Sequence, residues 1–282
     1  MFDPLEEQRI AGRGSAVLSA QTIVSTLLGL GFFVLIARIL GPLGLGLYAA
    51  AGILAAFGTA LGGFGLLSAA ARFAAFLDLR GAEPAFRRTL LLLTATAAVL
   101  SGAVLFAAAP WASLLMTRTT ANADLFRLAA LVVSASIAAG VLDGWMQGRR
   151  AFGTLAVYRL LAKIVSTGLG VGLVLAGFGV AGVLVSLIAY LVLLAGLIAP
   201  RFAGGLRDRR GYPVAEVARF AAPITASNVA GIASGSAESL LIVALLATPD
   251  LGVYNVALTV GTVLVLLPNG RVLITGGLDA SG

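Results

Sequence analysis

Long runs of apolar residues, most of them about 20 residues long, follow one another through this chain of 282 residues, with short polar segments between them. A helix of about 20 mainly apolar residues is long enough to cross the hydrocarbon core of a membrane. Only 11% of the residues are charged, against roughly 25% in a soluble domain, so this much apolar surface could not be hidden from water. We therefore predict an all-α polytopic membrane protein.

Eight of these runs are expected to form transmembrane helices. Their approximate ranges are 14–37, 45–70, 89–109, 125–146, 155–176, 180–199, 221–247 and 251–267. Polar loops are expected at 72–88 and 111–124. The first run is longer than the apolar core of a signal peptide, which has about 7–15 residues, so we expect it to be retained.

The basic residues indicate the orientation of these helices. With the N-terminus in the cytoplasm, sixteen of the 19 Lys and Arg residues fall on the cytoplasmic side, Arg159 and Lys163 among them, and Arg38, Arg118 and Arg127 fall outside. Cytoplasmic segments carry such an excess of basic residues. We expect a multi-pass protein of the bacterial inner membrane with both ends in the cytoplasm. Because the basic residues are scattered between apolar runs, the expected partners are membrane lipids and not nucleic acid.

A short break between the first two runs recurs later in the chain. RILGPLGLGLY, at 38–48, matches ALLATPDLGVY, at 244–254, with Gly46 aligned on Gly252 and Tyr48 on Tyr254. Six expected helices separate the copies, an even number, so both enter the membrane in the same direction. Such parallel repeats are related by an axis along the membrane normal. We predict a six-helix lobe at 1–210, the first two helices of a second lobe at 211–268, and an irregular tail at 269–282.

The amino-acid composition excludes several kinds of catalysis and metal binding. The chain has no cysteine and no histidine, which excludes disulfides, thiolate catalysis, and metal binding or acid–base catalysis by histidine. We expect neither an enzyme nor a bound cofactor or metal.

Ionisable residues inside a membrane are candidates for function. Glu238 lies within the seventh expected helix, where steps of three, four and three residues place it on one face with Asn228, Gly231 and Gly235. The matching face of the first helix carries Thr22, Ser25, Gly29 and Phe32. One interpretation is a cavity wall, in which Glu238 gates transport or binds a cation. The alternative is helix packing through small residues, with Glu238 protonated or hydrogen-bonded.

Two arginines stand out among the basic residues. Arg72, at the end of the second expected helix, could attract a pyrophosphate-linked headgroup, because guanidinium binds phosphate with two hydrogen bonds. Arg38 lies on the outer side, where its alternative role is to extend to the membrane interface. Asp143 is expected to form a local ion pair with the nearby Arg149 or Arg150.

Five segments together carry a resemblance to a known family. They are IARILGPLGLGLYAAA at 36–51, GFGLLSAAARFAA at 63–75, QGRRAFGTLAVYRLL at 147–161, RFAAPITASNVA at 219–230 and LGVYNVA at 251–257. In order and spacing, the chain resembles the polysaccharide-biosynthesis, or oligosaccharide flippase, family of the multidrug/oligosaccharidyl-lipid/polysaccharide flippase superfamily. That family places a basic residue before an aromatic one where this chain has Arg72.

The resemblance implies two six-helix lobes around a central cavity, and movement of lipid-linked sugars from the inner to the outer leaflet by alternating access. It also implies a functional association with glycosyltransferases and a polymerase. The chain departs from the pattern because it lacks most of the second lobe.

Three alternatives remain open. A multidrug or cation antiporter of the same superfamily would need carboxylates in the first lobe, and the cores of the first three expected helices contain none. A membrane-embedded sugar polymerase or ligase would need a larger outer loop than 110–124. An inactive gene fragment would explain why the apolar pattern ends after Pro268.

Overall fold

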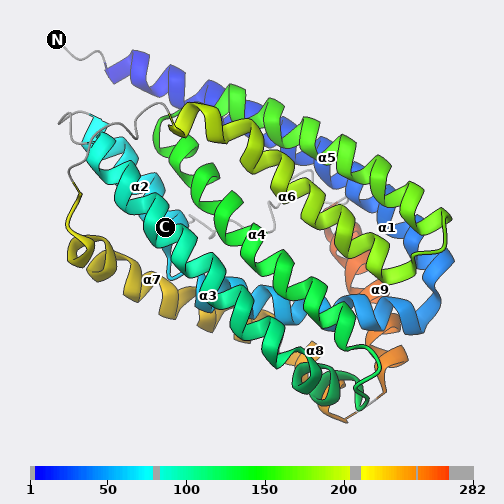
Figure 1. Ribbon diagram of the computed structural model, residues 1–282. Helices are drawn as coiled ribbons and strands as arrows, with labels where there is room; N and C mark the ends of the chain where they lie inside the picture. Colours follow the sequence, from blue (N-terminus) through cyan, green and yellow to red (C-terminus); the bar gives the residue numbers. More distant parts are fainter. Residues whose placement is uncertain (1–3, 79–82, 204–210, 246, 267–282) are drawn as a thin grey trace.

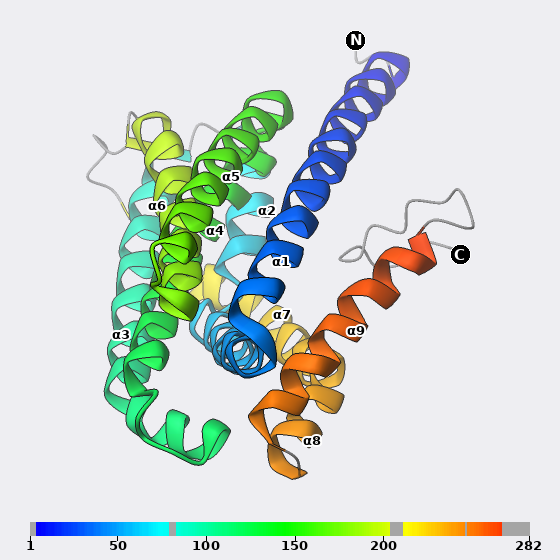
Figure 2. The same cartoon turned by 90° about the vertical axis from the view of Figure 1, so that its right-hand side faces the viewer.

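The computed structural model describes residues 4–78, 83–203, 211–245 and 247–266, and within these ranges the chain forms helices and no strand. The helices, shown in Figures 1 and 2, are α1 Pro4–Gly62, α2 Leu66–Asp78, α3 Glu83–Thr117, α4 Ala123–Gly148, α5 Phe152–Leu175, α6 Gly179–Ala203, α7 Val214–Gly235, α8 Ala237–Leu245 and α9 Thr248–Leu266. The prediction of an all-α polytopic protein is confirmed. The expected tail at 269–282 lies outside the described residues.

Helix α1 contains the first two expected membrane helices and turns sharply between them, as Figure 1 shows. The turn is at Gly41, whose φ of 64° and ψ of −177° are accessible to almost no residue but glycine. Pro42 follows, and its fixed φ and missing N–H suit the first turn of a new helix. The Gly-Pro break therefore allows the chain to reverse within the length of one residue.

The second half of α1 ends at Gly62, earlier than expected, and the segment 72–88 is not the polar loop that we predicted. Positive φ angles at Phe64 and Gly65 separate α1 from α2, which includes Arg72, and α3 already begins at Glu83. The periodicity of α2 explains the difference. One face of α2 is buried, so the exposed Arg72 can remain helical on the other; the buried residues are Leu66, Ala69, Ala70, Ala74 and Leu77.

Two other expected boundaries also differ. Helix α3 continues through Pro110 to Thr117, so the connection to α4 is 118–122 and not 111–124. The seventh expected helix, 221–247, is divided at Ser236 into α7 and α8. The expected fourth, fifth and sixth helices correspond to α4, α5 and α6.

Five described helices are long and apolar enough to cross a membrane: α1, counted from Val17, and α3 to α6. Because α1 turns back at Gly41, these five helices can account for the first six expected passes. The turn at Gly41 and the connections α3–α4 and α5–α6 lie at one end of the bundle, at the lower right of Figure 1. This alternation agrees with the expected order of the first six passes.

The largest apolar core lies among α2, α3, α4 and α6, where Phe86, Leu90 and Ile198 are completely buried. Close helix approach forms part of it: a Cβ atom on Gly144 would lie 2.4 Å from the carbonyl oxygen of Leu67, and one on Gly148 would lie 2.2 Å from that of Ala71. Only glycine allows α2 and α4 to pack this tightly, as is common between membrane helices.

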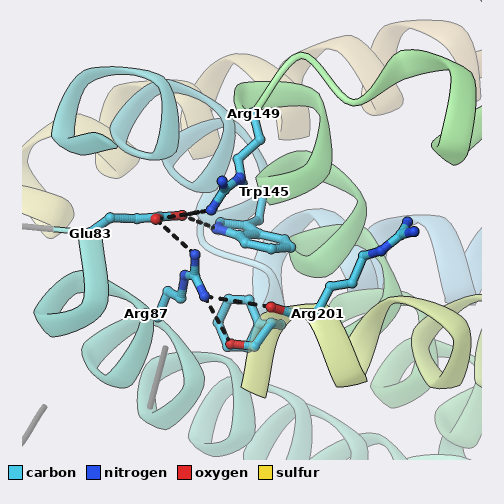
Figure 3. A network of polar contacts seen from close by, with 6 residues as sticks. Glu83, Arg87, Trp145, Arg149 and Arg201 are labelled. Carbon is cyan, nitrogen blue, oxygen red and sulfur yellow. Dashed lines mark hydrogen bonds and ion pairs between the residues drawn. The ribbon is translucent and has the colours of Figure 1, made fainter. Parts of the chain in front are cut away.

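A buried carboxylate joins three helices at the other end of the bundle, shown in Figure 3. Glu83, at the start of α3, accepts hydrogen bonds from Arg87 Nη2 at 2.7 Å, Trp145 Nε1 at 2.9 Å and Arg149 Nη1 at 3.1 Å. Arg87 Nη1 also donates to the carbonyl oxygens of Arg201 and Phe202 at the end of α6. The ends of α3, α4 and α6 are therefore held by charge-assisted hydrogen bonds, which are stronger than neutral ones.

The two copies of the repeat pack against each other where α1 meets α9. A Cβ atom on Gly46 would lie 1.9 Å from the carbonyl oxygen of Thr248, and one on Gly252 would lie 2.0 Å from that of Pro42. Pro42 and Thr248 are themselves equivalent positions in the repeat. Each copy thus makes the same contact with the other, which is the signature of a two-fold relationship.

Candidate functional site

A polar cavity of about 640 Å³ lies between the first half of α1 and helices α4, α5 and α6. Ligand sites commonly have volumes of about 300–1,000 Å³. Hydroxyl, amide and charged side chains contribute much of its lining: Gln21, Thr22, Ser25, Thr26, Tyr48, Ser136, Asp143, Arg159, Lys163, Ser166, Thr167, Ser186 and Tyr190. So many polar groups within apolar helices indicate a site that takes a polar ligand.

The first half of α1 contributes the face that the sequence singled out. Thr22, Ser25, Gly29 and Phe32 all line the cavity. Thr22 Oγ1 donates to the carbonyl oxygen of Leu18 at 2.8 Å, and Ser25 Oγ accepts from Gln21 Nε2 at 2.7 Å. The hydroxyl proton of Ser25 has no acceptor among the described residues and is available to a ligand.

An ion pair between α4 and α5 forms the cytoplasm-facing part of the lining in the expected orientation. Arg159 Nε lies 2.8 Å from Asp143 Oδ1 and Arg159 Nη2 lies 2.6 Å from Asp143 Oδ2, a geometry that makes the contact both strong and directional. Gln147 Nε2 also donates to Asp143 Oδ2, at 2.7 Å. The expected pairing of Asp143 with Arg149 or Arg150 is wrong, because α4 directs Asp143 towards α5 while Arg149 reaches Glu83.

Lys163 lies one helical turn beyond Arg159 on the same face of α5 and lines the same cavity. Its ammonium group makes no ion pair and no hydrogen bond with any other described residue, whereas its carbonyl oxygen accepts from Ser166 Oγ at 3.1 Å. Its Nζ would lie 3.9 Å from a Cβ atom on Gly29. Arg159 and Lys163 were counted among the cytoplasmic charges, although the expected helix 155–176 contains both, and both lie within α5, which begins at Phe152. At a rise of about 1.5 Å per residue, Lys163 lies roughly 16 Å along the axis of α5 from its first residue, Phe152.

A signal for these residues was present in the sequence. Arg159, Lys163, Ser166 and Gly170 follow steps of four, three and four residues, a helical spacing of the same kind as the three, four and three that singled out the face of α1. That face of α5 therefore carries a polar stripe, which could have been recognised before the structure was known.

The comparisons with known proteins identify the family. A sequence model of a polysaccharide biosynthesis protein family matches residues 35–270, which cover both copies of the repeat and all the described helices from the second half of α1 onwards. The chain belongs to this family. No curated protein and no solved structure matches the chain.

The general role of this polysaccharide biosynthesis family member follows from its family. It is a multi-pass membrane protein of the polysaccharide-precursor flippase or transporter type. No group of three or more Asp or Glu side chains in the described part of the chain could hold a metal ion. Transport, rather than covalent chemistry, is the activity that fits the family.

Arg72 and Arg38 lie outside the polar cavity of this family member. Arg72 is exposed on α2, and its guanidinium carbon lies 4.4 Å from the ring centre of Phe220 on α7. It lines two smaller cavities, one between α2 and α7 and the other between α2 and the α4–α5 connection. Arg38 is exposed on α1, three residues before the turn at Gly41.

Asn228 and Glu238 do not share one continuous helical face, because Ser236 ends α7 before Glu238 begins the first turn of α8. Both residues are exposed. The hydroxyl of Tyr254, on α9, donates a hydrogen bond to Glu238 Oε2. Tyr254 is the tyrosine of the second repeat copy, so this hydrogen bond connects α8 with that copy on α9.

Proposed function

We propose that this protein moves lipid-linked oligosaccharide or polysaccharide precursors across the bacterial inner membrane by alternating access. The observation that carries the proposal is the reciprocal contact of the two repeat copies at Gly46 and Gly252. Two repeats related by an axis along the membrane normal form lobes that can rock against each other. From this contact the first half of α1 and α9 diverge towards the end of the bundle where α1 begins, as Figure 2 shows.

The polar cavity supports a sugar-bearing substrate. Thr22 and Ser25 are positioned to contact hydroxyl groups, and Phe32, Tyr48 and Tyr190 add aromatic surface to the lining. Arg72 is proposed to attract the diphosphate group at the cytoplasmic end. Arg38, Asn228 and Glu238 remain proposed transport residues outside the cavity.

The same cavity gives less support to a cation antiporter. Such a protein needs a carboxylate that is free to bind a proton or a metal cation. Among the described residues, Asp143 is the one acidic residue that lines the cavity, and Arg159 and Gln147 already occupy both of its oxygens. A flippase for an anionic, sugar-bearing lipid is therefore the better match.

The proposal includes an orientation and partners. The N-terminus is placed in the cytoplasm, residues 1–210 form one lobe, and 211–268 begin the second. Glycosyltransferases would supply the lipid-linked sugars, and a polymerase would use them on the other side of the membrane.

A vesicle assay tests the function. The full chain would be reconstituted into liposomes with a fluorescent polyprenyl-diphosphate-linked saccharide, and the probe in the outer leaflet would be measured by a membrane-impermeant quencher. We expect probe to cross faster than in protein-free vesicles, and faster than a fluorescent phosphatidylcholine in the same vesicles. Equal rates with and without protein would refute the proposed transport.

A further inference from the structure

Lys163 presents a charge that the cavity itself does not compensate. Two basic residues, Arg159 and Lys163, and one acidic residue, Asp143, line the cavity. Asp143 is bound on both oxygens by Arg159, which leaves it no direct contact with Lys163. A charge at membrane depth is costly unless it is paired or hydrated, so Lys163 requires an anion or water in the cavity.

Unpaired hydrogen-bonding groups lie in the same cavity. Gln21 Oε1 is buried and accepts no hydrogen bond from the described residues. A buried acceptor without a partner is unfavourable, because it has lost its hydrogen bonds to water. The Ser25 hydroxyl already accepts from Gln21 Nε2 and retains its proton for another group. The cavity therefore offers a cation, a donor and an acceptor at once.

We propose that this cavity within the first lobe binds a phosphate-class oxyanion, with Lys163 as the residue that pairs with it. Ser25 donates to the oxyanion or to the group attached to it, and Gln21 Oε1 accepts from a hydroxyl of the ligand. The Arg159–Asp143 pair is a positioning element, because it keeps the one acidic group of the cavity away from Lys163. The site itself is separate from the contact between the two repeats on which alternating access rests.

The oxyanion could be a free phosphate or diphosphate, or the headgroup of a lipid. This inference rests on the proposed function only if the headgroup belongs to a lipid-linked sugar. Two experimental arms separate the sources. In the first, the full chain in nanodiscs of phosphatidylcholine is titrated with inorganic diphosphate in a calorimeter at low salt. In the second, the bound phospholipid is quantified after purification from vesicles that contain equal amounts of phosphatidylglycerol and phosphatidylcholine.

Three variants test the role of Lys163 in both arms. Lys163→Met keeps the length of the side chain and removes its charge, and Lys163→Arg keeps the charge. Arg127→Met removes a cation that lies outside the cavity, on the second turn of α4. We expect Lys163→Met to weaken anion binding at least tenfold in one arm. Lys163→Arg should stay within about threefold of the unchanged chain, and Arg127→Met should bind equally well.

The outcomes distinguish this inference from the proposed function. Lys163-dependent binding of diphosphate identifies a free oxyanion as a ligand, and Lys163-dependent enrichment of phosphatidylglycerol identifies a headgroup. Binding that Lys163→Met leaves unchanged, or the absence of binding in both arms, would overturn the inference even if the vesicle assay showed transport. Conversely, Lys163-dependent binding without transport would refute the flippase proposal and leave the oxyanion site standing.

Discussion

Gly252 of the second repeat copy packs directly against its counterpart in the first copy, Gly46: a Cβ atom on Gly252 would lie 2.8 Å from the backbone nitrogen of Gly46. Neither residue has room for a side chain. Leu45 and Leu251, which precede the two glycines, are both buried. The repeated Leu-Gly pair therefore forms the central contact between α1 and α9.

Larger residues at either glycine should separate these two helices. For Gly46→Ala or Gly252→Ala, the new methyl group meets backbone atoms that cannot rotate away, and we expect a loss of about 1–3 kcal/mol of stability. The measurement is unfolding by sodium dodecyl sulfate titration in mixed micelles. Gly52→Ala, with no atom within 4 Å of the new methyl group, is the matched control and should be neutral or stabilising. Equal behaviour of the three variants would contradict the close contact.

The turn at Gly41 should depend on backbone freedom and not on space. A Cβ atom there would meet nothing within 4 Å, yet its φ of 64° is rarely adopted by other residues. We expect Gly41→Ala to cost about 1–3 kcal/mol in the same unfolding measurement. Gly31→Ala, a helical position on α1 that is equally open, serves as the control. A Gly41→Ala protein as stable as its control would show that the reversal does not need glycine.

Removal of the Asp143 carboxylate should leave the positive charge of Arg159 without a partner in the cavity. The side chains of Asp143 and Arg159 are 9% and 23% exposed, and removal of one partner of a buried ion pair costs about 3–5 kcal/mol. We expect Asp143→Asn to lower stability by an amount of this order. Asp124→Asn breaks the exposed pair with Arg127, whose side chains are 87% and 43% exposed, and should cost less than about 1 kcal/mol. Similar losses for both variants would argue against burial of the Asp143 pair.

The Glu83 network can be followed by the fluorescence of Trp145. This tryptophan is 2% exposed and the other, Trp111, is 81% exposed, so Trp111→Phe gives a chain with one buried reporter. In that background, we expect Glu83→Gln to raise quenching of Trp145 by acrylamide, because Arg87 and Arg149 would lose their shared carboxylate. Glu216→Gln, on α7, removes a carboxylate that accepts a hydrogen bond from Tyr212 and is not part of the Glu83 network, so it should leave the quenching unchanged. No difference between the two variants would show that Glu83 does not hold this end of the bundle.

The orientation can be tested with single cysteines, since the natural chain has none. Ala121, between α3 and α4, and Gly153, at the start of α5, are exposed at opposite ends of the bundle. With the N-terminus in the cytoplasm, an impermeant maleimide added to intact cells should label Ala121→Cys and not Gly153→Cys, and permeabilised cells should show both. The reverse pattern in intact cells would invert the topology.

Several features could be predicted from the sequence because they depend on local properties. Apolar length determined which segments cross the membrane, and the recurrence of Leu-Gly-x-Tyr revealed the repeat. The spacing of Thr22 and Ser25 placed them on one face, and the structure places that face in a cavity. Helix boundaries were predicted less accurately where the periodicity of a segment and its charge disagreed. In α2, Arg72 lies on the exposed face of a helix and not in a loop.

The sequence by itself determined the class of the protein, because a chain this apolar has only one solvent in which it can fold, and each apolar run must satisfy its backbone hydrogen bonds internally as a helix. Only the tertiary structure decided which charges meet. Asp143 has arginines nearby in the sequence, yet it pairs with Arg159 of the next helix, and Lys163 faces the same cavity without an acidic partner among the described residues. Such pairings depend on how each helix is rotated about its axis, which is set by packing against several neighbours at once and not by any one segment.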